Sequence, residues 1–480
     1  MNNGQLVIKP SSKHSRAHFR YWSVRHARLW EVVYQFFLPT LRFIRPVINI
    51  FPDGLTHPII SKIERSLKGI FFDCNMCGDC VLSSTGMSCP MNCPKHIRNG
   101  PCGGVRENGN CEIEPDMKCV WLDAWSGAAK MKNADRNGWQ ITNVQLPLDS
   151  SLDGRSSWLA VMNEDINVNI STHSPTTKAT VVESKSPLRS KFDSGKITIT
   201  AEYNPPDTTD PARILAGAQN LLEVCDAINV TDGAGGNTHI SSLSVCTLLV
   251  QAKHNPVMQI SCRDKNRIAI QGEALGAAAL GIKNILCLTG DGISSGDQPS
   301  AKPVFDLDCS TLLTTLKMMR DESQFTSGKT IDAAPDFYLG ATANPCAISA
   351  EIEIERIAKK IDAGAQFIQT QFCFDPEAFH DFYSLYTARG LQERARLLVG
   401  VGPISSAKAG LWMRNNIAGI RIPDRLIERL EQAYDQKEEG MNICVELIQG
   451  YLTVDHLAGF HIMAFQQPNK VAEIIRRVGL

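Results

Sequence analysis

The sequence has no long apolar run and no strong excess of charge of either sign. Its best apolar run, VVYQFFLPTL, is short and contains Gln35 and Pro39, whereas a membrane-spanning helix needs about 18 or more apolar residues. The formal net charge is -1 over 480 residues, which gives no general attraction to the phosphates of nucleic acid. We therefore expect neither a transmembrane segment nor a nucleic-acid partner.

Acidic residues are absent from the first 30 positions, where six basic residues occur: Lys9, Lys13, Arg16, Arg20, Arg25 and Arg28. This composition is compatible with a transit peptide, but it lacks the apolar core of a secretory signal. We expect a cytoplasmic protein, in which thiols stay reduced. The 16 cysteines therefore favour metal binding over a disulfide framework.

Four zones follow one another along the chain. Residues 1–70 are basic and amphipathic, 71–126 are cysteine-rich, 127–195 are rich in Ser and Thr, and 196–480 alternate between apolar runs and helical segments. The polar third zone predicts a linker.

Apolar residues recur at helical spacing in the first zone: Trp22, Leu29, Trp30, Val33, Tyr34, Phe37, Leu38 and Leu41. Such a stripe usually faces a protein core, so we expect a helix that packs on another domain. A helix lying on a membrane surface is the alternative.

The fourth zone contains eight pairs of an apolar run and a helical segment, from KITITAEY to GFHIMAFQQ with the helix that follows it. Eight such pairs predict a (β/α)8 TIM barrel, with a doubly wound sheet as the alternative. In a barrel of this kind, functional residues lie where the strands end and the loops begin. Polar residues at those strand ends are therefore the candidates for a site.

Half of the cysteines lie in the second zone: Cys74, Cys77, Cys80, Cys89, Cys93, Cys102, Cys111 and Cys119. The first three are spaced C-x2-C-x2-C and a Cys-Pro pair follows, which is typical of the ligands of a [4Fe–4S] cluster. Eight thiols could hold two clusters. Structural zinc also uses C-x2-C pairs and stays the alternative.

The motifs AEYNPP, LTGD and DAGAQFIQTQFCFD are followed by GVGPIS and RIP, in this order, within residues 196–480. In this they resemble the methylenetetrahydrofolate reductase family, flavin-dependent barrels that reduce methylenetetrahydrofolate to methyltetrahydrofolate. The cysteine segments CNMCGDCVL and CPMNCPKHIRNGPCGG resemble the cysteine-rich domain of the small partner subunit of acetogen-type reductases. The resemblance implies a bound FAD, with FMN as the alternative, and a tetrahydrofolate derivative as substrate.

The resemblance also implies roles for individual side chains. Glu202, in AEYNPP, matches the acid that protonates the folate. Asp291, in LTGD, matches a carboxylate near flavin and pterin, and Gln371 matches an amide that contacts the folate. The implied flavin-binding positions are Thr231, Gln259, Gly290, Asp291, Asn344, Arg356, Lys359 and Lys360. Each role has an alternative. Glu202 could be an ion-pair carboxylate, Asp291 a helix cap and Gln371 a structural amide. The basic residues could form ion pairs on the protein surface.

Three positions depart from the family pattern. Gln259 and Asn344 stand where well-known members have flavin-contacting histidines, and Ala407 stands where they have a phenylalanine that packs on the nicotinamide cofactor and the folate. Direct use of NAD(P)H is therefore in question. A redox protein that exchanges electrons through the cysteine segment is the alternative donor or acceptor.

We thus expect a flavoprotein oxidoreductase that interconverts methylene- and methyltetrahydrofolate. The sequence is compatible with a homo-oligomer. Two other functions stay open: a methyl-folate:corrinoid methyltransferase, and a non-enzymatic, metal-bound assembly partner. A flavin spectrum separates the first from the reductase, because the methyltransferase needs no flavin.

Overall fold

The computed structural model describes residues 17–48, 50–132, 141–163, 184–464 and 467–480. The chain forms two compact units. The first is Met1–Arg98 with Lys118–Ser174, and the second is Asn99–Met117 with Pro175–Leu480. The cysteine-rich zone of residues 71–126 is therefore divided between the two units.

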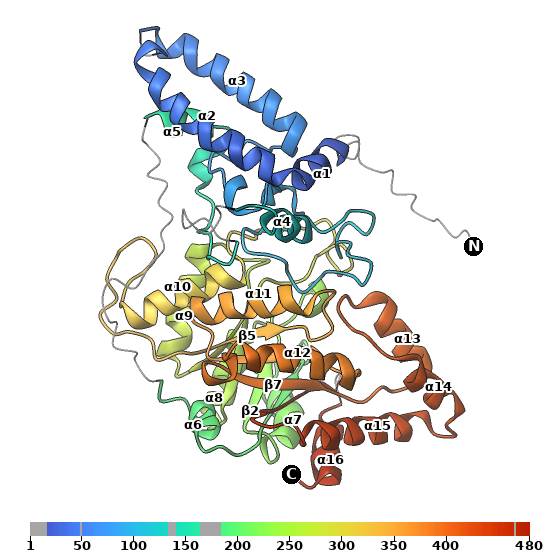
Figure 1. Ribbon diagram of the computed structural model, residues 1–480. Coiled ribbons are helices and arrows are strands. Elements are labelled where there is room, and N and C mark those ends of the chain that lie inside the picture. The colour runs from blue at the N-terminus through green and yellow to red at the C-terminus, as the bar shows by residue number, and fades with distance from the viewer. Residues whose placement is uncertain (1–16, 49, 133–140, 164–183, 465–466) are drawn as a thin grey trace, which may run out of the picture. The chain divides into compact units, whose positions relative to one another are not determined.

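The first unit is helical. It contains α1 (Ala17–Arg25), α2 (Ala27–Ile48), α3 (Asp53–Phe72), α4 (Val120–Ala128) and α5 (Ser157–Asn163), with short 3-10 turns at Leu82–Ser84, Pro90–Asn92 and Ser150–Leu152. Helices α2 and α3 form a long hairpin (Figure 1). Their inner faces pack on two small apolar clusters, one around Phe72 and Met87 and one around Leu41 and Trp158.

The apolar residues predicted to form one buried stripe divide between two environments. Tyr34 and Leu41 are buried, whereas Trp22, Leu29 and Val33 are exposed. The expectation that this helix packs on another domain stays a prediction. Apolar residues lie on two sides of α2, and helical periodicity alone does not show which side meets the core.

The second unit contains a closed barrel of eight parallel strands in the order β1 to β8 (Figure 1). The strands are β1 (Thr198–Tyr203), β2 (Ala227–Val230), β3 (Pro256–Ser261), β4 (Asn284–Leu288), β5 (Tyr338–Ala343), β6 (Phe367–Phe372), β7 (Arg396–Val401) and β8 (Gly459–Ile462). The last strand closes the barrel on the first, with Thr198 opposite Gly459. This confirms the predicted (β/α)8 barrel.

Helices alternate with the strands and cover the barrel. They are α6 (Pro187–Asp193), α7 (Pro211–Leu222), α8 (Ser242–Gln251), α9 (Arg267–Ala279), α10 (Cys309–Asp321), α11 (Ala350–Ala363), α12 (Pro376–Ala388), α13 (Ala407–Asn416), α14 (Asp424–Gln432), α15 (Gln436–Tyr451) and α16 (Pro468–Val478), with 3-10 turns at Ala234–Gly236 and Leu391–Glu393. Among the described residues, no helix combines the length and apolar character needed to cross a bilayer.

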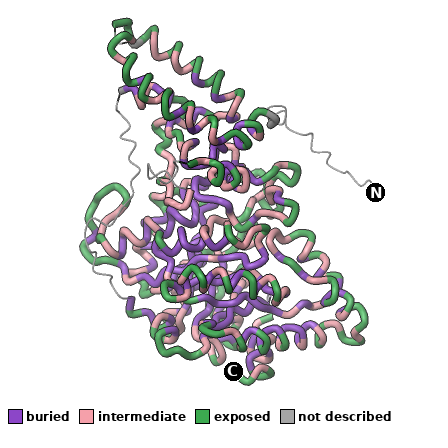
Figure 2. Tube along the Cα trace, viewed as in Figure 1, coloured by how far each residue is buried: buried purple, intermediate pink, exposed green. Residues whose placement is uncertain are grey.

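The barrel interior is built in layers, because alternate residues of each strand point inward. At the strand starts, an apolar layer includes Val257, Tyr338 and Phe367, and it packs against Leu188 and Phe192 of α6. Figure 2 shows the strands as the most continuously buried part of the chain. Helix α6 lies within the predicted linker. This helix has few apolar residues within a polar stretch of sequence, but two of them, Leu188 and Phe192, cover this end of the barrel.

A polar layer follows above the apolar one. The amide of Gln369 donates to Thr200 Oγ1 at 3.1 Å, and it exchanges hydrogen bonds with the amide of Asn229. The Nδ1 atom of His461 lies 2.9 Å from the same threonine oxygen. Burial lowers the pKa of His461 to about 4, so the imidazole is neutral at physiological pH.

Candidate active site

The strand periodicity directs several predicted residues into the carboxyl end of the barrel. Glu202, Thr231 and Gln371 each lie two positions beyond a member of the polar layer on the same strand or at its end. Side chains two apart on a regular strand share a face, so Glu202 and Thr231 belong to the barrel mouth, where sites form in this fold. Gln371 lies at the same end of the barrel, but the register of β6 shifts between Gln369 and Phe372, so strand alternation does not fix the direction of its side chain.

Glu202 is the candidate acid. Burial raises the pKa of its carboxyl, the nearby Asp291 raises it further, and a hydrogen bond from Asn204 opposes both effects. That bond joins Asn204 Nδ2 to Glu202 Oε1 at 3.3 Å, and Asn204 Oδ1 in turn accepts from Thr231 Oγ1 at 2.9 Å. A carboxyl with a raised pKa keeps its proton to a higher pH and can deliver it to a substrate.

The loop that carries Asp291 is held tightly against the neighbouring strand end. Gly290 has a φ of +95°, and an added Cβ would lie 2.3 Å from the Oγ of Ser261 and 2.9 Å from the Cβ of Arg263. Only glycine fits this position without strain. The fixed loop holds Asp291 within electrostatic reach of both Glu202 and Arg263.

The three predicted amides lie in different environments. Gln259 and Asn344 are buried, at 7% exposure each. The Oδ1 of Asn344 accepts the backbone N–H of Cys346 at 3.0 Å. Gln371 is half-buried, and its Oε1 accepts the backbone N–H of Phe372 at 3.0 Å. The NH2 group does not take part in this hydrogen bond and can donate to a ligand.

The predicted basic residues of α11 are buried rather than on the surface. Arg356 donates to Glu353 at 2.6 Å and to the carbonyl of Pro101 at 2.9 Å, and Lys360 donates to the carbonyl of Thr342 at 2.5 Å. Burial lowers the pKa of Lys359 to about 7 and also lowers the pKa of Lys360. Arg356 thus pairs with Glu353 of its own helix, as the alternative expected, but the pair is buried rather than on the surface.

Segment Asn99–Met117 packs on this side of the barrel. Asn99 Nδ2 donates to the carboxylate of Asp308 at 3.1 and 3.3 Å, and Glu107 lies 3.8 Å from Arg421. A Cβ on Gly292, one residue after Asp291, would meet Ile113 at 2.9 Å. The sequence of this segment does not indicate that it belongs to the barrel unit rather than to the unit that contains the other cysteines of the pattern.

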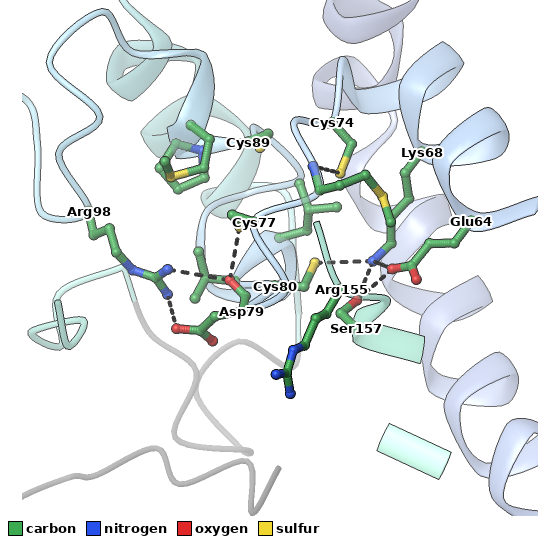
Figure 3. Close-up of a pocket in the computed structure, with 16 residues that line it drawn as sticks. Glu64, Lys68, Cys74, Cys77, Asp79, Cys80, Cys89, Arg98, Arg155 and Ser157 are labelled. Atoms are coloured by element: carbon green, nitrogen blue, oxygen red, sulfur yellow. Dashed lines mark hydrogen bonds and ion pairs between the residues drawn. The ribbon is translucent and has the colours of Figure 1, made fainter. Parts of the chain in front are cut away.

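Four of the predicted thiols line one pocket in the first unit. Cys74, Cys77, Cys80 and Cys89 surround it, together with Lys68 (Figure 3). The Sγ of Cys74 accepts the backbone N–H of Met76 at 3.3 Å. Among the described residues, no group of three or more His, Cys, Asp or Glu side chains is arranged to hold a metal ion.

A buried lysine places positive charge at these thiols. Lys68 Nζ donates to Cys80 Sγ at 3.4 Å, to Glu64 at 2.6 Å and to Ser157 at 2.7 Å (Figure 3). Burial alone would lower the pKa of Lys68, but Cys80, Tyr34 and Glu64 together raise it above the usual lysine range. The ammonium group therefore stays charged. Cysteine spacing could not reveal this lysine, because it lies on α3, outside the cysteine pattern.

The other four cysteines of the pattern do not line this pocket. Cys93 and Cys119 are buried in the same unit, whereas Cys102 and Cys111 belong to the barrel unit. In the barrel unit, Cys102 lies within electrostatic reach of Arg356 and Lys360.

The barrel defines the class of protein. A closed (β/α)8 fold with a carboxyl of raised pKa, buried amides and buried cations at the strand ends is the architecture of a TIM-barrel enzyme site. Residues 187–479 match the family described as methylenetetrahydrofolate reductase, and residues 55–145 match a module described as methylene-tetrahydrofolate reductase C terminal. Because the first match covers more than half of the chain, the chain belongs to the methylenetetrahydrofolate reductase family, which is a family of oxidoreductases.

Relatives of known name share the barrel region. The chain is 26% identical over 308 residues to methylenetetrahydrofolate reductase 2 of Schizosaccharomyces pombe, covering 61% of this chain and 47% of the relative. It is 25% identical over 298 residues to 5,10-methylenetetrahydrofolate reductase of Escherichia coli, covering 60% of this chain and 92% of the relative. The chain thus spans about half the length of the fungal relative.

One solved structure is also similar. It is described as an uncharacterized protein from Clostridium thermocellum that binds two copies of 5-methyl-5,6,7,8-tetrahydrofolic acid, with a TM-score of 0.43 and 18% identity, covering 60% of this chain and 96% of that one. The comparisons confirm the predicted family. The likeness of the cysteine segment to an acetogen-type partner subunit stays a prediction.

Proposed function

We propose that this chain interconverts 5,10-methylene- and 5-methyltetrahydrofolate at the barrel mouth, with Glu202 as the acid. The observation that carries the proposal is the raised pKa of Glu202 beside Asp291, on the inward face of β1 at its carboxyl end. Membership of the family supplies the substrate class.

In the reducing direction, Glu202 donates its proton to the bridging nitrogen of the folate ring. The bond between that nitrogen and the methylene carbon breaks, and its electron pair stays on the nitrogen. The cationic iminium that remains takes up a hydride at its carbon and becomes the methyl group. Asp291 lies near Glu202, and its negative charge would stabilise the cation. Gln371 would hold the pterin through its NH2 group.

FAD, or FMN, would supply the hydride when it is bound and reduced. The residues of the mouth fit such a group. Thr231, Gln259 and Asn344 are buried polar side chains near the strand ends, and Gly290 leaves the loop backbone open to close approach.

The α11 side of the mouth fits the phosphate of a flavin nucleotide. Arg356, Lys359 and Lys360 are three buried basic residues, and the carboxylates that act on them are Glu353 and Asp308. Burial lowers the pKa of both lysines, and a bound anion would favour their charged form. These residues would therefore bind the phosphate, with the Pro101 carbonyl giving up its contact with Arg356.

We also propose that the thiol pocket binds a cluster of iron and inorganic sulfide through Cys74, Cys77, Cys80 and Cys89. The donors suit a cluster: four thiols, a backbone N–H to sulfur and a lysine ammonium to sulfur. A zinc ion would draw four sulfurs to within about 4 Å of one another, whereas a cluster binds each sulfur to a different iron. Zinc stays the alternative occupant of the pocket.

Such a cluster would exchange electrons with a redox protein. Ala407 supports this route, because its small side chain is buried at the start of α13 and its backbone N–H donates to Gln436 at 3.0 Å. A bulky ring for nicotinamide to stack on is absent at that position.

The proposal is tested on the purified full chain. We expect a bound flavin in the absorption spectrum, and reoxidation of the dithionite-reduced flavin when methylenetetrahydrofolate is added, with methyltetrahydrofolate as product. A protein without flavin that transfers the methyl group to a corrinoid would support the methyltransferase instead. Folate binding without turnover of either kind would support the assembly partner.

A further inference from the structure

The outside of the α2–α3 hairpin carries an unusual amount of apolar surface. Of the 23 exposed large apolar side chains among the described residues, 15 lie between Phe19 and Ile70. Phe43 is 85% exposed and Ile50 is 76% exposed. Figure 2 shows the hairpin exposed along most of its length. Contiguous apolar surface of this kind on a protein usually marks an interaction site.

The exposed residues of α2 form one stripe. Leu29, Val33, Phe36, Phe43, Ile44 and Val47 fall within an arc of about 100° when successive residues are placed 100° apart around the helix. The buried residues of α2, which are Ala27, Glu31, Tyr34 and Leu41, fall on the opposite side. The stripe therefore points away from the core of its own unit.

Helix α3 repeats the pattern. Leu55, Ile59, Ile63, Leu67 and Ile70 are all about half exposed and share one side of the helix. Glu64, Lys68 and Phe72, which are buried, occupy the other side. We call these two stripes, with Ile50 and Phe51 between the helices, the hairpin face.

Basic side chains accompany the hairpin face on α3. Lys62 and Arg65 are exposed, and Lys62 lies within about 20° of the apolar stripe of α3 around the helix. The glutamates of the two helices are buried and paired, Glu31 with Arg28 and Glu64 with Lys68. An apolar stripe bordered by exposed basic side chains is the composition of a helix that lies in the headgroup region of an anionic membrane.

We propose that the hairpin face binds peripherally to the surface of an anionic lipid bilayer, with its apolar side chains among the acyl chains and the basic side chains at the headgroup phosphates. A second copy of this chain is a poorer occupant, because the exposed Lys62 and Arg65 of both copies would be brought together. The inference is independent of the folate chemistry proposed for the barrel.

The test uses the full chain and vesicle flotation, with vesicles of phosphatidylglycerol and phosphatidylcholine compared with phosphatidylcholine alone. The apolar variant is Phe43→Ser with Val47→Ser, and the charge variant is Lys62→Glu with Arg65→Glu. The matched control is Ile268→Ser, because Ile268 is 76% exposed on α9 of the barrel unit. Circular dichroism shows whether each variant keeps its fold, which the exposure of these side chains leads us to expect.

The wild type and the Ile268→Ser control should bind the anionic vesicles, and high salt should weaken the binding. Each double variant should bind at least about tenfold more weakly. The proposal is overturned if the wild type does not float with anionic vesicles, or if folded Phe43→Ser/Val47→Ser floats as well as the wild type. It is also overturned if light scattering shows a dimer that the apolar variant converts to a monomer, with no lipid binding by either.

Discussion

Lys359 allows a quantitative test of the buried cations beside the barrel mouth. Burial lowers its pKa from 10.5 to about 7, with the nearby Asp308 opposing the shift. The folded state therefore binds this proton more weakly than the unfolded state. Between about pH 7 and pH 10 the unfolded state holds more protons, so the free energy of unfolding must rise with pH in that window.

The expected size follows from the two pKa values. Between about pH 6 and pH 9 this one group should raise the free energy of unfolding by about 2–3 kcal/mol. Lys359→Met removes the titration while keeping much of the volume. The variant should therefore gain more stability over the wild type at pH 6 than at pH 9, by that same amount.

The assay is urea unfolding of the full chain at several pH values, followed by circular dichroism, with wild type and variant compared in the transition of the barrel. Lys408→Met is the matched control, because it makes the same substitution at an exposed lysine of the barrel unit. If the stability difference between wild type and Lys359→Met is flat from pH 6 to pH 9, the reasoning about the buried lysine is refuted.

Three further outcomes are expected. Gly290→Ala should lower the melting temperature and weaken flavin retention, because the position has φ +95° and an added Cβ would meet Ser261; an unchanged flavin content would contradict the role given to this loop. Cys77→Ser should lose iron and acid-labile sulfide on metal analysis while keeping its flavin, whereas Cys225→Ser, outside the pocket, should keep all three. Zinc instead of iron in the wild type would contradict the proposed cluster. Asn204→Ala should raise the pKa of Glu202 further, since the hydrogen bond from Asn204 lowers it, and should move the fall of the reductive rate to higher pH; a shift in the opposite direction would argue against Glu202 as the group that titrates.

The barrel could be predicted from the sequence because the pair of an apolar run and a helical segment occurs eight times. Each strand is an apolar run closed by polar residues, and the family motifs fall at the strand ends in the right order. Glu202 could be placed at the mouth for the same reason, since strand periodicity fixes which way its side chain points. The direction of Gln371 could not be predicted in this way, because the register of β6 shifts between Gln369 and Phe372.

Other features depend on contacts between residues far apart in the sequence. Helix α6 closes the barrel with only Leu188 and Phe192, too few apolar residues to stand out within a polar stretch. The division of the cysteine zone depends on Asn99 and Pro101 contacting the barrel at Asp308 and Arg356. No spacing rule for cysteines contains that information.

The burial of charged side chains could not be predicted from the sequence either. Arg356 and Lys360 lie four apart on a helix with acidic residues, a pattern that usually means solvent-exposed pairs. In the structure both are buried, and the reason is tertiary: segment Asn99–Met117 contacts this side of the barrel. A shortened chain that begins near Ser194 would lose that segment and α6 together, so activity is best measured on the full chain.

The most direct test of the account is the rate at which methylenetetrahydrofolate reoxidises the reduced flavin in Glu202→Gln. We expect this rate to fall by about 10²–10⁴-fold, the usual contribution of a general acid, with flavin binding and fold retained. Glu377→Gln, which changes an exposed carboxylate on α12, should react like the wild type. A wild-type rate in Glu202→Gln would remove Glu202 from the chemistry and contradict the proposed site.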